Sequence, residues 1–171
     1  MTRVLACLLG LVLVGTAPAA DLSAYPCSMF SHGFCFRPPL GAEVEYSTPA
    51  DFELYKVFGD GGEVAVMYVG NHPDLPEQGT LDATRIDGVA VRTRVQSTDG
   101  PAYDLDVYLE TGRGSFVHIS SAVSGRNYDD VQSLLSSIKK CSTGRNKAIC
   151  ASGSKLGLRV FEHLQLERPA K

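Results

Sequence analysis

The stretch Val89–Glu110, VAVRTRVQSTDGPAYDLDVYLE, decides the fold class, because apolar and polar side chains alternate along both of its halves. A period of two places alternate side chains on opposite faces of a strand. Asp99-Gly100 separates the two halves and is typical of a tight turn. The stretch therefore predicts two neighbouring antiparallel strands, 89–96 and 102–110, each with one buried face and one wet face.

Three more strands are expected around this pair. Ser115–Ala122 (SFVHISSA) follows a glycine-rich turn and completes a three-stranded meander. Upstream, Phe52–Phe58 (FELYKVF) and Glu63–Val69 (EVAVMYV) are rich in aromatic and β-branched residues, which favour strands. The four residues between them, 59–62, read Gly-Asp-Gly-Gly and predict a hairpin turn.

Charges on the meander are arranged so that two strands complement one another. Arg92 and Arg94 lie on the wet face of strand 89–96, while Asp104 and Asp106 share one face of strand 102–110. We expect these cross-strand charges to help set the register and to contribute little stability, as on a solvated surface.

The clearest helix is Tyr128–Lys140 (YDDVQSLLSSIKK), preceded by Asn127 as the N-cap. The apolar residues that recur at helical spacing are Val131, Leu134, Leu135 and Ile138. Asp129 and Asp130 complement the positive end of the helix, and the two lysines at 139–140 suit its other end. Residues 155–166 fit a helix or a strand almost equally well. The expected class is α+β, an antiparallel sheet packed by one or two helices.

The N-terminus predicts export. Arg3 precedes an apolar run of eleven residues, Val4–Val14, which is too short to span a bilayer and typical of a signal peptide. Small residues at 17 and 19 indicate cleavage after Ala19. We therefore expect a signal peptide at 1–19, a loop-like arm with a disulfide loop at 20–39, and one α+β domain at 40–171. No second apolar run of that length follows, so no integral membrane span is expected after cleavage.

The charge of the chain argues against some classes of partner, and its cysteine content indicates the compartment. The formal net charge is −3, without a basic block, which argues against nucleic acid and anionic lipid. Four cysteines remain after cleavage, an even number that indicates two disulfides in an exported domain. The spacing suggests Cys27–Cys35 and Cys141–Cys150, and the two pairings that join the arm to residues 141–150 stay open.

A late helix of the form Asp-Asp-Val-x-x-Leu-Leu-x-Ser-Ile follows the meander within Phe116–Ile138. In this arrangement the chain resembles the PsbP/Mog1-like exported domains. The resemblance implies an α/β/α sandwich and a non-enzymatic accessory or binding role, and it transfers no functional residue.

Catalytic and metal-binding patterns are weak. The four histidines are far apart in sequence, and no HExxH, Cys-x-x-Cys or GxSxG motif occurs. His32 lies between Cys27 and Cys35, but an oxidised cysteine cannot ligate zinc. We therefore expect no metal and no cofactor. His118, which shares a strand face with Phe116, fits a packed and hydrogen-bonded histidine better than a catalytic one.

Residues 124–128, Ser-Gly-Arg-Asn-Tyr, match the pattern Ser-Gly-x-x-Tyr. The pattern resembles a loop of some periplasmic lysozyme inhibitors, where the loop enters the active-site cleft of the enzyme. The resemblance implies binding by Ser124 and Tyr128. The same residues also have a structural interpretation, in which Gly125 turns the chain and Asn127 caps the helix.

The segment Met29–Phe36 (MFSHGFCF) gathers aromatic side chains in a loop that a disulfide would close. An exposed apolar patch of this kind marks a contact site, and a rigid loop loses less entropy on binding. The expected binding residues here are Phe30, His32, Phe34 and Phe36. The alternative is that these side chains attach the arm to the sheet.

These patterns favour a non-enzymatic protein-binding domain, periplasmic or secreted, whose partner is another envelope or secreted protein. A specific form is an inhibitor or immunity-type protein that blocks a hydrolase. Two alternatives remain: a small envelope hydrolase that uses His118 with Asp104 or Asp106, and a structural or assembly subunit of an envelope complex.

Overall fold

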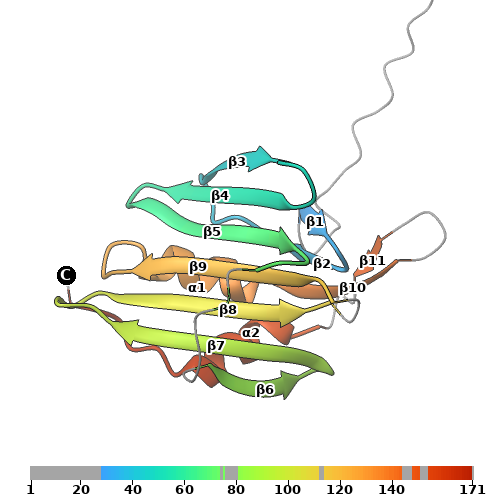
Figure 1. Cartoon of the computed structure of the whole chain (residues 1–171). Helices are drawn as coiled ribbons and strands as arrows, with labels where there is room; N and C mark the ends of the chain where they lie inside the picture. The colour runs from blue at the N-terminus through green and yellow to red at the C-terminus, as the bar shows by residue number, and fades with distance from the viewer. Residues whose placement is uncertain are drawn as a thin grey trace, which may run out of the picture.

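The described part of the chain forms two antiparallel sheets and two helices (Figure 1). The structure is a computed structural model, and the residues that it describes are 28–73, 75, 81–111, 114–143, 148–150 and 154–170. The expected signal peptide and Cys27 lie outside the described residues. The predicted class, α+β with antiparallel strands, is confirmed, and strands make up most of the regular structure.

The main sheet has seven strands in the order β3-β4-β5-β9-β8-β7-β6. Their bounds are β3 Glu43–Ser47, β4 Glu53–Gly59, β5 Gly62–Gly70, β6 Asp82–Ile86, β7 Val89–Ser97, β8 Tyr103–Glu110 and β9 Phe116–Val123. The five strands predicted from the sequence are all present, and each end lies within one residue of its predicted position. The two edge strands, β3 and β6, were not predicted.

The small sheet has the order β1-β2-β10-β11, with bounds β1 Met29–Ser31, β2 Phe34–Phe36, β10 Lys139–Thr143 and β11 Ala148–Cys150. The expectation of a loop-like arm is therefore wrong for this segment. His32 and Gly33 have φ angles of 45° and 88°, and a two-residue turn with positive φ at both positions closes a tight hairpin. The hairpin then pairs through β2 with β10.

The first helix, α1, runs from Tyr128 to Ser136 and is shorter than predicted. It begins after Asn127, as expected, but its C-terminal end is four residues earlier than the predicted one. Lys139 and Lys140 do not close the helix, because their main chain pairs with Cys35 and Phe34 of β2. The helix therefore ends because the residues after it pair with a strand that is distant in sequence, which the local sequence does not reveal.

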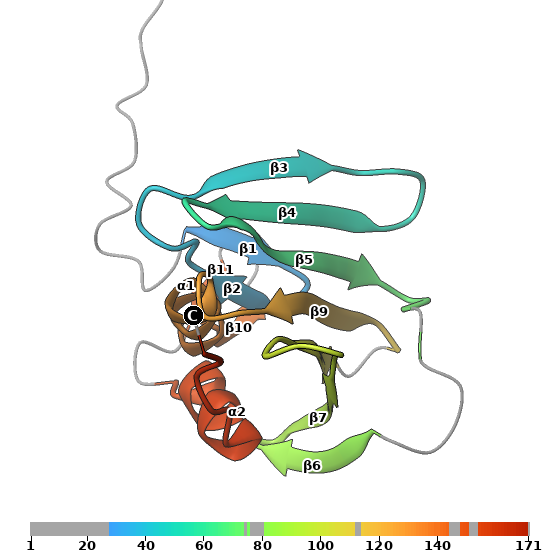
Figure 2. The ribbon, with the colours of Figure 1, turned by 90° about the vertical axis from the view of Figure 1, so that its left-hand side faces the viewer.

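The second helix, α2 (Leu156–Leu164), resolves the ambiguous tail and packs closely on α1. Gly157 permits this approach: a Cβ atom there would lie 2.0 Å from the carbonyl oxygen of Leu135. Figure 2 shows both helices and the small sheet on one side of the main sheet, which curves around them. The core between these layers is built from the inward-facing apolar residues of β4, β5, β7, β8 and β9, together with α1 and α2.

Candidate functional site

The aromatic segment of the β1–β2 hairpin is divided between the core and the surface. Phe34 and Phe36 are 5% and 3% exposed and belong to the main core. Phe30 is 36% exposed, and the side chain of His32 in the turn is 42% exposed. Of the four expected binding residues in this segment, Phe30 and His32 are therefore the two that a partner could touch directly.

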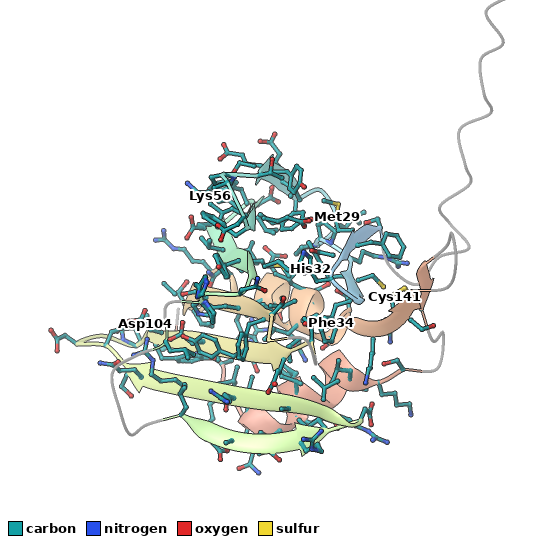
Figure 3. All side chains as sticks on the ribbon, turned by 45° about the vertical axis from the view of Figure 1, so that its right-hand side comes forward. Met29, His32, Phe34, Lys56, Asp104 and Cys141 are labelled. Carbon is teal, nitrogen blue, oxygen red and sulfur yellow. A yellow bond between two sulfur atoms is a disulfide. The ribbon has the colours of Figure 1, made fainter. Side chains whose placement is uncertain are left out.

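The hairpin is fixed to the main sheet by a polar cluster around Glu53 of β4. Ser31 and Tyr55 donate hydrogen bonds to Glu53 Oε2 at 2.6 and 2.7 Å, and His32 Nε2 lies 3.9 Å from Oε1. Burial, together with the hydrogen bond to Glu53, raises the pKa of Tyr55 well above its usual value, so the phenol stays protonated. This cluster positions the hairpin turn beside β4, and Figure 3 shows His32 below Lys56 of that strand.

A second polar cluster lies on the face of the main sheet opposite the helices. Arg94 donates to Asp106 Oδ2 from Nε and Nη2 at 2.9 and 2.5 Å, and His118 Nε2 lies 2.8 Å from Oδ1. The ring of His118 stacks on Tyr108 with the centroids 4.1 Å apart. Asp104, the other expected acid of this strand, is exposed. It lies on the opposite side of the molecule from the β1–β2 hairpin (Figure 3).

Asp106 differs from the solvated carboxylate expected from the sequence, because it is 4% exposed. Burial alone would raise its pKa, but hydrogen bonds from His118 and Arg94 outweigh burial and lower the pKa below the usual value. Asp106 is therefore an anion at neutral pH. The cluster joins β7, β8 and β9, and it matches the sequence interpretation of His118 as a packed, hydrogen-bonded residue.

Side chains of the Ser-Gly-x-x-Tyr segment form hydrogen bonds with other parts of the chain. Asn127 Oδ1 accepts a hydrogen bond from the Ser124 amide at 2.8 Å, and Asn127 Nδ2 donates to the carbonyl oxygens of Glu63 and Ala122. The Asn127 side chain thus shapes the loop and does not cap α1. Tyr128, 9% exposed, donates to the carbonyl oxygen of Leu166 at 3.0 Å. The expectation that the Asn127 side chain caps the helix is therefore wrong, although the motif residues do have internal structural contacts.

Three sulfur atoms gather on successive strands of the small sheet, β2, β10 and β11. Cys141 and Cys150 face one another on β10 and β11 and form a disulfide, which excludes the pairings of either residue with the arm. Cys35 is also disulfide-bonded. Its expected partner, Cys27, lies outside the described residues. The Sγ atoms of Cys35, Cys141 and Cys150 all lie within 4.8 Å of one another.

The edge strand β3 is the site feature that sequence reasoning missed. Four of its five residues are exposed, and only Val44 is half-buried. Glu43 and Glu45 stand on the face away from the helices, while Tyr46 stands on the other face and is 54% exposed, its ring 4.8 Å from that of Tyr55. The alternation Glu-Val-Glu-Tyr-Ser was a readable signal for a strand, although a five-residue strand gives a weak one.

Comparisons with known proteins give no assignment. No protein-family model, no curated protein and no solved structure matches the chain. Within the described residues, neither helix combines the length and the apolar composition that crossing a bilayer requires. The Cys141–Cys150 disulfide is consistent with an oxidising compartment.

Proposed function

We propose that the chain is an exported protein-binding domain that receives a strand of its partner at β3. The observation that supports this most is the exposure of β3, where four of five residues are exposed at an edge of the main sheet. An edge strand offers backbone donors and acceptors for the addition of another strand. Figure 1 shows β3 as the outermost strand, with no described strand beyond it.

The side chains of β3 define the partner strand. Glu43 and Glu45 repeat every second residue on one face, and opposite charges on neighbouring strands attract one another. Val44 and Tyr46 repeat on the other face and favour apolar or aromatic neighbours. The partner is therefore a protein with an extended segment that alternates Lys or Arg with apolar residues.

A charge-reversal experiment tests this proposal. The purified, oxidised domain is used to capture proteins from envelope and culture extracts, and captured proteins are identified by mass spectrometry. The E43K/E45K variant should retain its partner at least tenfold less than the wild type. The matched control is D51K/D60K, which changes the net charge equally at two exposed acids outside β3. Equal retention by all three proteins, or an empty capture, would contradict the proposal.

Within this proposal the partner is an envelope hydrolase or toxin, and the domain acts as its inhibitor or immunity-type protein. Recovery of one such enzyme in near-equal amount, with its activity lost in the complex, would support this form. Recovery of several non-enzymatic envelope subunits would instead support the assembly role. The signal peptide at 1–19 belongs to the proposal as well, and N-terminal sequencing of the exported protein tests it.

The relationship to PsbP/Mog1-like domains is a further part of the proposal. It is supported by the segment Phe116–Ile138, in which strand β9 is followed directly by α1. The α/β/α sandwich of that resemblance requires helices on both faces of the sheet, whereas the two described helices lie on one face (Figure 2). Backbone assignment of the purified domain by NMR tests the relationship: helix on the second face would support it, and strands and loops alone on that face would contradict it.

A small hydrolase is the second candidate function, and the contact between His118 and Asp106 favours it. A carboxylate that orients an imidazole is part of many general-base sites. His118 retains 14% side-chain exposure, which leaves part of its ring accessible to a small substrate. This candidate predicts turnover of an envelope substrate that His118→Ala abolishes, and a substrate screen without turnover would exclude it.

A further inference from the structure

We propose that the sulfur cluster of the small sheet is a thiol–disulfide exchange site, in which Cys141 passes reduction from the more accessible Cys150 to the disulfide bond of the buried Cys35. This inference is independent of the proposed function. Three described sulfurs that belong to two disulfides lie within 4.8 Å of one another, so a rotation of one side chain brings a thiolate into contact with the neighbouring bond. A dithiol oxidoreductase is the class of partner that fits.

Burial assigns an order to the three sulfurs. Cys35 is fully buried at 0% exposure, Cys141 is 8% exposed, and Cys150 is half-buried. An external thiolate therefore reaches Cys150 first, whereas Cys35 is shielded from direct attack. Access is one of the factors that control which sulfur of a disulfide reacts. Direct attack on Cys35 Sγ from solvent is thus blocked, and the thiolate that reaches this atom comes from within the cluster.

The exchange proceeds in three steps. An external thiolate attacks Cys150 Sγ, the Cys141–Cys150 bond breaks, and Cys141 leaves as a thiolate. Cys141 Sγ then attacks Cys35 Sγ, forming a Cys35–Cys141 bond while the former partner sulfur of Cys35 leaves as a thiolate. The second thiol of the external dithiol attacks the mixed disulfide and releases Cys150 as a thiolate. Two electrons enter the protein, one disulfide remains, and the external dithiol leaves oxidised.

The fold accepts the new bond without rearrangement of the sheet. Cys35 and Cys141 lie on β2 and β10, which are already paired, and the Cys141 amide donates to the Gly33 carbonyl oxygen at 2.7 Å. Loss of the Cys141–Cys150 bond removes only the covalent link to β11, the three-residue edge strand of the small sheet. Metal binding by the same sulfurs is not available in this state, because both pairs are oxidised.

The variant Cys150→Ser tests the exchange without a reductant, because it leaves Cys141 as a thiol beside the Cys35 disulfide. The folded variant is incubated at pH 8, alkylated, digested without reduction and analysed by mass spectrometry. We expect a Cys35–Cys141 linked peptide in at least a tenth of the molecules, with a matching amount of alkylated Cys27. A free Cys141 in all folded molecules, with the Cys35 disulfide unchanged, would overturn the proposal.

A control variant and a second experiment complete the test. The control, Ser97→Cys, adds one thiol at the end of β7 to the otherwise unchanged chain. This thiol should remain unpaired, and both original disulfides should persist. If Cys150→Ser does not fold, the wild-type protein is treated with less than one equivalent of dithiothreitol and mapped in the same way. Singly reduced molecules should then contain the Cys35–Cys141 bond, and its absence would contradict the relay.

Discussion

At one edge of the main sheet β6 lies beneath α2, and at the other edge β3 lies open. His163 Nε2 of α2 lies 2.9 Å from Asp82 Oδ2 of β6. Arg159 of α2 forms a salt bridge with Asp87 in the turn that follows β6. β3 has no described helix against it, and its charged residues, Glu43 and Glu45, have the same sign. Proteins protect sheet edges from unwanted pairing by covering them or by charging them. In β6, contacts with α2 accompany exposed side chains of both charges, whereas the exposed charges of β3 are all negative and favour a partner of opposite charge.

The contacts of α2 at the β6 edge can be disrupted by a single substitution. Gly157→Ala is expected to have the largest effect on stability. A Cβ atom at this position would lie 2.0 Å from the Leu135 carbonyl oxygen and 2.8 Å from the Ile138 amide nitrogen, so α2 must move away from α1. We expect the free energy of unfolding to fall by about 3 kcal/mol in urea denaturation. Hydrogen exchange should accelerate in β6 and stay unchanged in β3.

Gly100→Ala is the matched control, because no atom lies within 4 Å of the added Cβ and the backbone has no positive φ there. It should change the free energy of unfolding by no more than about 0.5 kcal/mol. If Gly157→Ala behaves like this control, α2 does not close the β6 edge in the way described.

Asp106→Asn should have the next largest effect, because the variant leaves Arg94 without its anionic partner and weakens the contact with His118. Hydrogen bonds to charged groups contribute roughly 2 kcal/mol each, and we expect a loss of that order by urea denaturation. The cluster lies in the middle of the sheet, away from both edge strands. The substitution should therefore leave the relative hydrogen-exchange rates of the β3 and β6 amides unchanged. Unchanged stability would show that the ion pair contributes nothing.

The same substitution predicts a change in the pH dependence of stability. The folded-state pKa of Asp106 is lowered, so its contribution is present above the unfolded-state pKa of about 4 and is lost as pH falls through the folded-state value. The wild type should therefore lose stability steeply below about pH 4, and Asp106→Asn should lose less over the same range. Identical pH profiles from denaturant titrations between pH 2 and pH 7 would contradict the lowered pKa.

The hydrogen bond between His163 of α2 and Asp82 of β6 should have a smaller effect. Asp82 and His163 keep 69% and 34% side-chain exposure, and exposed pairs contribute about 0.5 kcal/mol. Asp82→Ala should lower the free energy of unfolding by about this amount and should accelerate exchange in β6 only slightly. A double-mutant cycle with His163→Ala measures the coupling, and a coupling of zero would leave close packing at Gly157 as the main cause of closure.

The smallest effect on stability is expected for E43K/E45K, since both side chains are exposed. Glu45 lies opposite Lys56 of β4, and exposed cross-strand charges contribute little. The free energy of unfolding should stay within about 0.5 kcal/mol of the wild type. Partner retention should nevertheless fall, as proposed above. A large loss of stability would mean that Glu43 and Glu45 support the fold itself, and any loss of binding would then have another explanation.

The sequence predicted the centre of the fold better than its edges. Long strands such as β7 and β8 alternate over eight or nine residues, so their pattern is unambiguous. The three-residue strands β1, β2 and β11 carry almost no periodic signal, and they form because the His32-Gly33 turn and the distant β10 bring them together. The same long-range pairing ends α1 early, which local helix propensity could not show.

The candidate site was less predictable than the fold, because exposure depends on what covers each residue. Phe30 and Phe34 belong to the same aromatic segment, yet Phe30 is exposed and Phe34 lies in the core. The pairing of Arg94 with Asp106 was readable from cross-strand charges, whereas the burial of Asp106 was not. The open edge at β3 could be recognised only after the strand order was known.

Hydrogen exchange on the captured complex tests the open edge most directly. Exchange of backbone amides is compared between the free domain and the complex by mass spectrometry, with β6 as the internal reference. We expect strong new protection within Glu43–Ser47 and none within Asp82–Ile86, because a partner strand pairs with β3 alone. Protection that omits Glu43–Ser47, or that falls on β6, would contradict strand addition at β3.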